Sequence, residues 1–134
     1  MSSPASNLAL ALDLLAEGVL CATVSGSVSL EGVVKRFQET FAFAAQSNTR
    51  KILFNCLGTT GELSTFDSYR FATRVMQYLR SLNIGNPAIA LVGKPPVFTG
   101  FCLQVAQNLG ALALAFADTK SALRWLTSPQ LQRS

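Results

Sequence analysis

The chain has 134 residues, of which 49% are hydrophobic and 13% are charged, and its formal net charge is +4. This length suits one domain with a single core, the apolar composition excludes a disordered chain, and the scattered Lys and Arg residues argue against nucleic acid as a partner. The absence of histidine excludes Ser-His and Cys-His nucleophilic mechanisms and most catalytic zinc sites.

The first elements of the chain are predicted as a β-hairpin. In residues 8–14 leucines alternate with Ala and Asp, residues 19–28 are rich in β-formers, and a Gly-containing turn lies at 16–18. The alternative is a helix over residues 8–16, because Ala, Leu and Glu are good helix formers. Residues 1–7 are expected to form a flexible N-terminus.

A first helix is predicted to begin after Ser29, which is a suitable N-cap residue. On its polar face Glu31 lies four residues before Lys35, a spacing that favours a weak ion pair. Phe43 projects away from the apolar stripe and is a candidate exposed contact. The stripe itself follows the helical period and comprises Leu30, Val33, Val34, Phe37, Phe41, Ala44 and Ala45.

The next stretch joins a buried strand to a second helix. An apolar run at residues 51–57, interrupted only by Asn55, predicts a central strand covered on both faces. A Gly-rich loop at residues 58–61 should follow. Ser64 then resembles the start of a capping box for a helix that runs to about residue 82. Strand-to-helix junctions of this kind are where α/β domains usually place a site.

The remaining elements complete an alternating pattern. A short buried strand is predicted at 88–92, and the two prolines that follow suit the first turn of a helix that stops at Gly110. A last strand at 112–116 precedes a helix capped by Asp118, and residues 128–134 are expected to form a flexible tail.

The predicted element order is ββαβαβαβα. Alternating strands and helices need crossover connections, which produce a largely parallel sheet, and the initial hairpin adds an antiparallel edge. We therefore predict a single α/β domain over residues 8–127, with a mixed, mostly parallel sheet of about five strands and about four helices.

Several segments of this pattern resemble the STAS domain, the fold of anti-sigma-factor antagonists and of cytoplasmic domains of sulfate transporters. More narrowly, the chain is similar to the small SpoIIAA-like STAS/SEC14 group of bacterial proteins. The resemblance covers residues 8–126 and implies a small non-catalytic binding or regulatory domain with a STAS-like fold. The matching segments are Gly26-Ser27-Val28-Ser29, the ILFNCLG strand and loop, Ser64-Thr65, Ala88-Ile89-Ala90-Leu91-Val92, Phe116-Ala117-Asp118 and Ala122-Leu123-Arg124-Trp125-Leu126.

In the antagonist branch of that family, a strand aspartate and an Asp-Ser-Ser-Gly motif precede a helix, and one serine is phosphorylated to switch partner binding. Here Asn55 stands in place of the strand aspartate, and Leu63-Ser64-Thr65-Phe66 stands in place of the motif. The hydroxyls are kept, but the aspartate and the glycine are lost. Ser64 and Thr65 are the candidate phosphoacceptors, and the alternative role for Ser64 is a helix cap.

Candidate binding residues are expected at the C-terminal ends of the parallel strands. The glycines at residues 58–61 suit an anion-binding nest or a simple turn, without the spacing of a P-loop. Lys94 should lie near them, because both segments follow parallel strands, so that one crevice forms. Phe98 either lines an apolar pocket below this crevice or belongs to the core. The predicted set is Asn55, Gly58, Thr59, Thr60, Gly61, Ser64, Thr65, Lys94, Phe98 and Asp118.

The leading hypothesis for function is a non-catalytic regulatory or protein-interaction module that binds a protein partner or a second copy of itself. The alternative is a binder of a small apolar or anionic ligand, such as a lipid or a metabolite. No cofactor, metal ligand or catalytic residue is expected. Aromatic candidates for a partner surface are Tyr69, Tyr78, Phe43 and Trp125.

An enzyme is the third class, and it would need Glu62 or Asp118 buried beside Lys94 in a pocket. The three cysteines are widely separated among apolar neighbours, as expected of reduced thiols in a cytoplasmic protein. No apolar run approaches the length of a membrane-spanning helix.

Overall fold

The computed structural model describes residues 8–93 and 100–129, with the backbone alone at 100–102. The predicted order of strands and helices is confirmed. The elements are β1 (Leu8–Leu14), β2 (Val19–Ser27), α1 (Leu30–Gln46), β3 (Lys51–Thr60), α2 (Thr65–Ser81), β4 (Ala88–Val92), α3 (Gly100–Asn108), β5 (Leu112–Phe116) and α4 (Thr119–Leu126). Lys94, Phe98, the two prolines between them, the N-terminus at 1–7 and the tail at 130–134 lie outside the described residues.

The N-terminal hairpin is confirmed, and the helical alternative for residues 8–16 is wrong. Leu8 pairs with Gly26, and Leu14 pairs with Leu20, in an unbroken antiparallel register. The physical reason is that alternate leucines of β1 point to one face of the sheet, where they pack against the core. A helix would have distributed the same leucines around its circumference.

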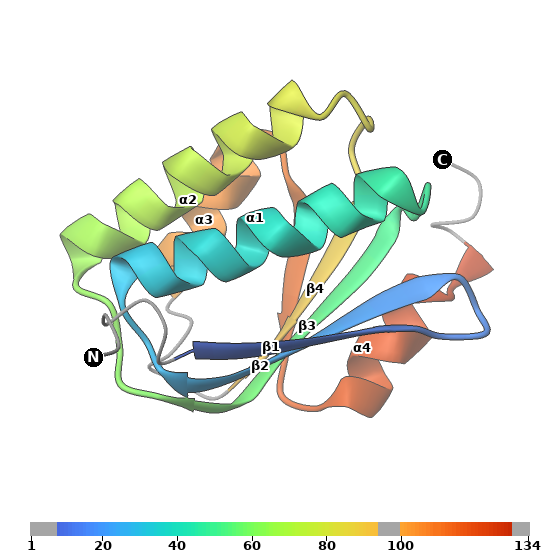
Figure 1. Ribbon diagram of the computed structural model, residues 1–134, viewed down its shortest axis with the longest axis horizontal. Coiled ribbons are helices and arrows are strands. Elements are labelled where there is room, and N and C mark those ends of the chain that lie inside the picture. The colour runs from blue at the N-terminus through green and yellow to red at the C-terminus, as the bar shows by residue number, and fades with distance from the viewer. Residues whose placement is uncertain (1–7, 94–99, 130–134) are drawn as a thin grey trace.

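The five strands form one sheet in the order β1-β2-β3-β4-β5. Only β1 is antiparallel to its neighbour, and the β2–β3, β3–β4 and β4–β5 pairs are parallel. Helices α1, α2 and α3 cover one face of the sheet, and α4 lies on the opposite face (Figure 1). The mixed, mostly parallel α/β sheet expected from the sequence is therefore confirmed.

The larger core lies between the sheet and the layer of α1, α2 and α3. The ring of Phe37 from α1 stacks on the ring of Phe54 from β3, with centroids 3.8 Å apart and planes 6° from parallel. Phe41 and Phe71 meet these rings edge-on. Edge-to-face contacts such as Phe71 on Phe37 and Phe41 on Phe54 are a favoured aromatic geometry. Together with the close stack of Phe37 on Phe54, they tie both helices to the central strand.

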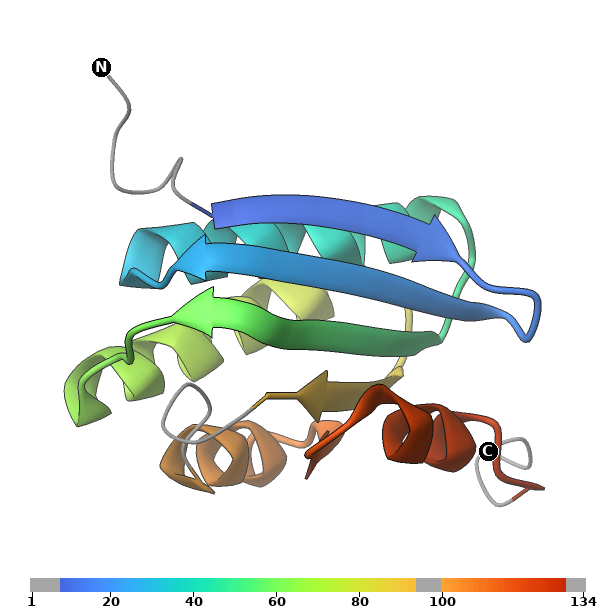
Figure 2. The same cartoon turned by 90° about the horizontal axis from the view of Figure 1, so that it is seen from below.

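A smaller core lies under α4. Ala122 and Leu126 pack on Leu53 of β3 and on the alanines of β4. Residue Leu53 is thus buried on one face of β3 while Phe54 is buried on the other, as expected of a central strand. Within the described residues, α4 covers the β4 side of this face and leaves the β1 and β2 side without a helix (Figure 2).

The helix starts follow the predicted caps. The Ser29 hydroxyl accepts a hydrogen bond from the Gly32 N–H at 3.1 Å, and Asp118 accepts one from the Ser121 N–H at 2.7 Å. The predicted partner of Glu31 is wrong, because its carboxylate binds Arg74 on α2 instead of the helical neighbour at position 35. An ion pair across two helices depends on their packing, which the spacing along one helix does not reveal.

Candidate functional site

The junction between β3 and α2 differs from the predicted loop. Strand β3 continues to Thr60, and the Gly-Thr-Thr segment at 58–60 pairs in parallel with residues 25–27 of β2. The prediction of a loop over 58–60 was therefore wrong. The cause is the length of β2, whose residues 25–27 offer backbone partners to residues 58–60. Glycine disfavours a strand, but the two threonines that follow it favour one.

A β-bulge lies immediately before this paired stretch. Thr23 pairs with Asn55, but two positions further along β2 the partner is Gly58, so that β3 contains one extra residue. The Asn55 side chain accepts a hydrogen bond from the N–H of Leu57 at 3.1 Å. The Thr59 hydroxyl donates to the carbonyl of Cys56 at 2.7 Å. Both predicted site residues thus bond to the backbone of their own strand at the bulge.

The two glycines of the segment have backbone roles. A Cβ on Gly58 would lie 3.1 Å from the Cβ of Ser25, which is closer than an ordinary contact, so a larger residue would require Ser25 to shift by a few tenths of an ångström. Gly61 has φ +84°, in the region that favours glycine. The carbonyl of Thr60 accepts a hydrogen bond from the Val28 N–H at 2.9 Å. The segment therefore forms a strand end and a turn.

The start of α2 carries two exposed hydroxyl groups. Ser64 accepts a hydrogen bond from the Asp67 N–H at 3.0 Å, which confirms the predicted N-cap. Thr65 is the first residue of the helix, and its side chain is exposed. These two residues lie next to each other at one end of the sheet.

Asp118 does not join them. Residue Asn55 is level with Val92 and Phe116, the last residues of β4 and β5. Strand β3 continues five residues beyond that level to Thr60, which at about 3.3 Å per residue is roughly 16 Å. Figures 1 and 2 both place the start of α4 away from the start of α2. Asp118 therefore does not share a crevice with Ser64 and Thr65, and the other two predicted members, Lys94 and Phe98, lie outside the described residues.

The titratable groups considered for chemistry are two carboxylates, Asp118 and Glu62, and two thiols, Cys56 and Cys21. A hydrogen bond from Ser121 lowers the pKa of Asp118, which is exposed, as is Glu62. An enzyme would need one of these two carboxylates to be buried, and neither is. Burial raises the pKa of Cys56 to about 12 and also raises that of Cys21. Both thiols are protonated near neutral pH, so neither is an activated nucleophile.

Two aromatic rings project into solvent at the start of α2. The exposed fraction is 68% for Phe66 and 51% for Tyr69. The guanidinium of Arg70 lies 5.6 Å from the centroid of the Phe66 ring, within the range of a cation–π contact. We call Phe66, Tyr69 and Arg70 the aromatic turn. Sequence reasoning missed Phe66, although its position off the buried stripe of the helix was a usable signal.

The other predicted aromatic candidates lie elsewhere. Phe43 is 36% exposed on α1, and Tyr78 packs partly buried against the larger core. The Trp125 ring contacts the Phe116 ring on the α4 side, with centroids 5.7 Å apart. These residues belong to different faces, so Tyr69 is the only one of the four that lies in the aromatic turn.

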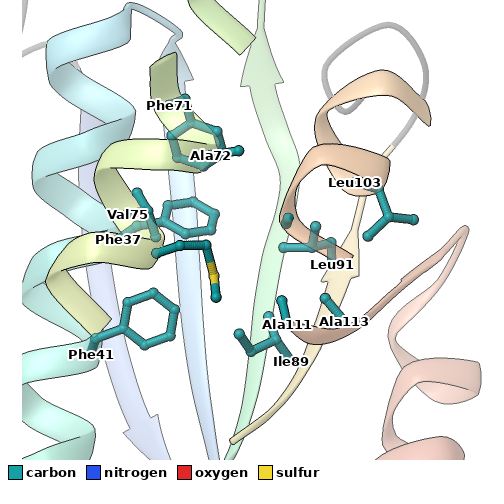
Figure 3. A pocket seen from close by; sticks show the side chains of 12 residues that line it. Phe37, Phe41, Phe71, Ala72, Val75, Ile89, Leu91, Leu103, Ala111 and Ala113 are labelled. Atoms are coloured by element: carbon teal, nitrogen blue, oxygen red, sulfur yellow. The ribbon is translucent and has the colours of Figure 1, made fainter. Parts of the chain in front are cut away.

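An apolar cavity lies beneath α2 and α3 (Figure 3). Its volume is about 40 Å³, and all its lining residues are apolar. They include Phe37, Phe71 and Met76 on the side of α1 and α2, and Leu103 and Ala106 on α3. Pockets for drug-sized ligands have volumes of roughly 300 to 1,000 Å³, so the cavity in this conformation is a gap in packing.

Among the residues that the structure describes, no group of three or more His, Cys, Asp or Glu side chains is placed to hold a metal ion. No helix in the same residues is long and apolar enough to cross a membrane.

Comparisons with known proteins identify the fold. No family model matches the chain, and no curated protein matches its sequence. A solved structure described as the crystal structure of an anti-sigma factor antagonist from Mycobacterium paratuberculosis superposes with a TM-score of 0.62. The alignment covers 96% of this chain and 100% of that chain, at 11% sequence identity. The STAS-like fold expected from the sequence is confirmed.

Proposed function

We propose that this protein is a non-catalytic regulatory module that binds a protein partner through the aromatic turn at the start of α2. The observation that carries the proposal is the exposure of Phe66 and Tyr69 side by side on one helix. Aromatic residues and arginine are enriched at the centres of protein interfaces and dominate their binding energy.

The aromatic turn is held on a rigid support. Directly behind it, Phe71 and Ala72 of the same helix are buried in the larger core, and the Ser64 cap fixes the first turn. A side chain on such a support loses little conformational freedom on binding. A phenylalanine buries about 200 Å² when fully covered. Covering the 68% of Phe66 that is exposed would remove about 140 Å² from water, a gross gain of about 3 kcal/mol from which the costs of association are subtracted.

The fold gives this proposal a context by analogy. The solved protein that shares the fold is described as an antagonist of an anti-sigma factor, and such a protein acts on another protein. Fold alone does not determine function, so the proposal depends on the exposed aromatic turn of this chain. A protein partner is part of this proposal, and a cytoplasmic location is proposed with it because Cys21 and Cys56 are free thiols.

The experiment is a quantitative affinity purification from the native host. A Phe66→Ala, Tyr69→Ala double variant is compared with the unmodified chain and with Phe43→Ala, a matched control that removes an exposed ring from α1. We expect a protein that the unmodified chain and the control retain and that the double variant loses. Thermal unfolding of all three proteins checks that the variants are folded. Equal recovery by all three would contradict the proposal.

A second candidate function is binding of a small apolar ligand, and the cavity beneath α2 and α3 is the observation that favours it. Its apolar lining suits a hydrocarbon better than an anionic metabolite. Because the volume is about 40 Å³, a lipid chain would have to separate α3 from α2. A ligand at 100 times its dissociation constant stabilises the folded protein by about 2.7 kcal/mol.

Palmitate and inorganic phosphate are the probes for this alternative. Native mass spectrometry and thermal unfolding with palmitate should show an adduct and a higher melting temperature, and phosphate should show neither. Substitution Ala106→Phe fills the cavity and should remove the palmitate effect. No adduct and no shift with palmitate would exclude the apolar ligand, whereas an effect of phosphate alone would indicate an anion site instead.

A further inference from the structure

The two edges of the sheet differ in how many backbone groups are free. Strands β1 and β5 are the edges. In an antiparallel pair, the N–H and C=O of one residue point to the same side, and successive residues alternate. The Leu15 N–H donates to the Val19 carbonyl at 2.8 Å at the end of the hairpin. The odd-numbered residues of β1 therefore bond to β2, and the even-numbered leucines direct their backbone groups outward.

The first outward group of β1 is already occupied. The Nε atom of Arg36 on α1 donates to the carbonyl of Leu8 at 2.8 Å, which agrees with the outward direction of the even-numbered residues. Leu10, Leu12 and Leu14 follow. Within the described part of the chain, no hydrogen bond occupies their outward N–H and C=O groups.

The opposite edge is shorter and more protected. The carbonyl of Phe116 in β5 accepts from the Gly93 N–H beside β4, so the outward residues of β5 are Ala113 and Ala115. The side chain of Gln107 donates to the Ala113 carbonyl at 2.8 Å. This edge thus has two outward residues, one of which has its carbonyl bonded.

Strand β1 lacks the devices that usually protect an edge. Natural edge strands carry lysines, prolines or bulges that prevent pairing with another chain. The β1 sequence LALALDL has no lysine or proline, and its register with β2 is continuous. Its single charge is Asp13, and Leu14 is 48% exposed. An edge of this kind is suited to pair with a further strand.

We propose that two copies of this chain associate through residues 10–14 of β1, antiparallel about a twofold axis at Leu12. In this register Leu12 faces Leu12 of the second copy, and Leu10 faces Leu14. All three are outward residues, so each pair exchanges both backbone hydrogen bonds. The pairing ends before Leu8, whose carbonyl remains bonded to Arg36.

The side chains fit this symmetric pairing. The leucines of both copies lie on the same face of the joined sheet, where the exposed Leu14 is covered by Leu10 of the second copy. On the other face, Asp13 lies opposite Ala11, so that like charges are not directly opposed. The interface is isologous, with the same strand used by both copies. The pairing through β1 does not use the aromatic turn of α2, so the dimer and the proposed partner binding are tested independently of each other.

Analytical ultracentrifugation of the full chain tests the proposal. The unmodified protein should sediment at twice the chain mass of 14.3 kDa. Leu12→Pro removes the central outward donor without removing a bond to β2, and it should give a monomer. The matched control is Ala115→Pro, which removes an outward donor at the other edge and should leave the dimer intact. The measurement is made at a protein concentration of roughly 100 μM, which is about 100 times a micromolar dissociation constant. An unmodified protein that is still a monomer at this concentration would overturn the proposal.

A second pair of variants guards against a folding defect. Leu14→Lys places a charge at an exposed position of β1 and should raise the dimer dissociation constant at least tenfold, while Leu114→Lys on β5 should not change it. Oxidation of Leu12→Cys should link two chains across the axis, because facing residues of such a pair lie about 5.5 Å apart at Cα. Leu10→Cys and the unmodified chain should not link. Dimers that survive both β1 substitutions, or equal linking of all three proteins, would refute this register.

Discussion

The guanidinium of Arg74 on α2 makes two hydrogen bonds to the carboxylate of Glu31 on α1, at 2.7 and 3.2 Å. This bidentate pair joins the two long helices above the larger core. The hydrogen bond from Arg74 lowers the pKa of Glu31 from its ordinary value of 4.5. Because both side chains are exposed, the pair is open to solvent and salt.

The Glu31 pair predicts an acid-dependent contribution to stability. A carboxylate whose folded-state pKa is lowered stabilises the fold above its unfolded pKa and loses that contribution as pH falls through the folded pKa. We expect Glu31→Gln to be less stable than the unmodified protein at pH 6, and this difference to be smaller near pH 2.5, because protonation of the carboxylate removes the contribution as the pH falls. Urea unfolding at both pH values measures the difference in unfolding free energy, with the exposed Glu62→Gln as a control. A difference of the same size at the lower pH would contradict the assignment.

The Cys56 thiol predicts a loss of stability in alkali. Burial raises its pKa from 9.0 to about 12, so between these values the unfolded chain ionises while the folded chain does not. The unfolded state then binds fewer protons, and stability falls with rising pH by about 1.4 kcal/mol per unit. Cys56→Ala should lack this component. The difference in unfolding free energy between the unmodified protein and Cys56→Ala, measured with denaturant, should therefore become smaller from pH 9 to pH 10.5. A constant difference would refute the prediction.

The stacked rings predict a large difference between two phenylalanine substitutions. Phe54 is fully buried against Phe37, whereas Phe66 is 68% exposed. Phe54→Ala should cost about 3 to 5 kcal/mol of unfolding free energy, because it leaves a cavity in the core. Phe66→Ala should change stability by about 0.5 kcal/mol or less. Chemical denaturation of both variants measures this, and comparable losses would show that the aromatic turn supports the fold.

The cap of α2 predicts a smaller and rescuable effect. Removing the Ser64 hydroxyl leaves the Asp67 N–H without its acceptor, so Ser64→Ala should cost about 1 kcal/mol. Ser64→Asn should recover most of this loss, because asparagine is an equally good N-cap residue. Thr65→Ala is the control, since it removes a neighbouring exposed hydroxyl that makes no cap. Equal losses from the alanine and asparagine variants would argue against a capping role.

Local chemistry made several features of this protein predictable from sequence. The caps Ser29, Ser64 and Asp118 each bond to a backbone group three residues away, and residue type alone signals such short-range bonds. The hairpin and the order of elements were predictable as well, because the alternation of apolar and polar residues and the helical period are properties of neighbouring residues.

The site depended on distant parts of the chain. The segment from Gly58 to Thr60 became strand because β2 offers partners to it, and Asp118 lies apart from Ser64 because β3 extends beyond β4 and β5. The partner of Glu31 lies on another helix, and the free edge of β1 follows from the strand order. Sequence by itself determined the order of the elements and the N-caps of α1, α2 and α4. Strand lengths, helix contacts and exposed edges were decided by tertiary structure, since each depends on groups that meet only after the chain has folded.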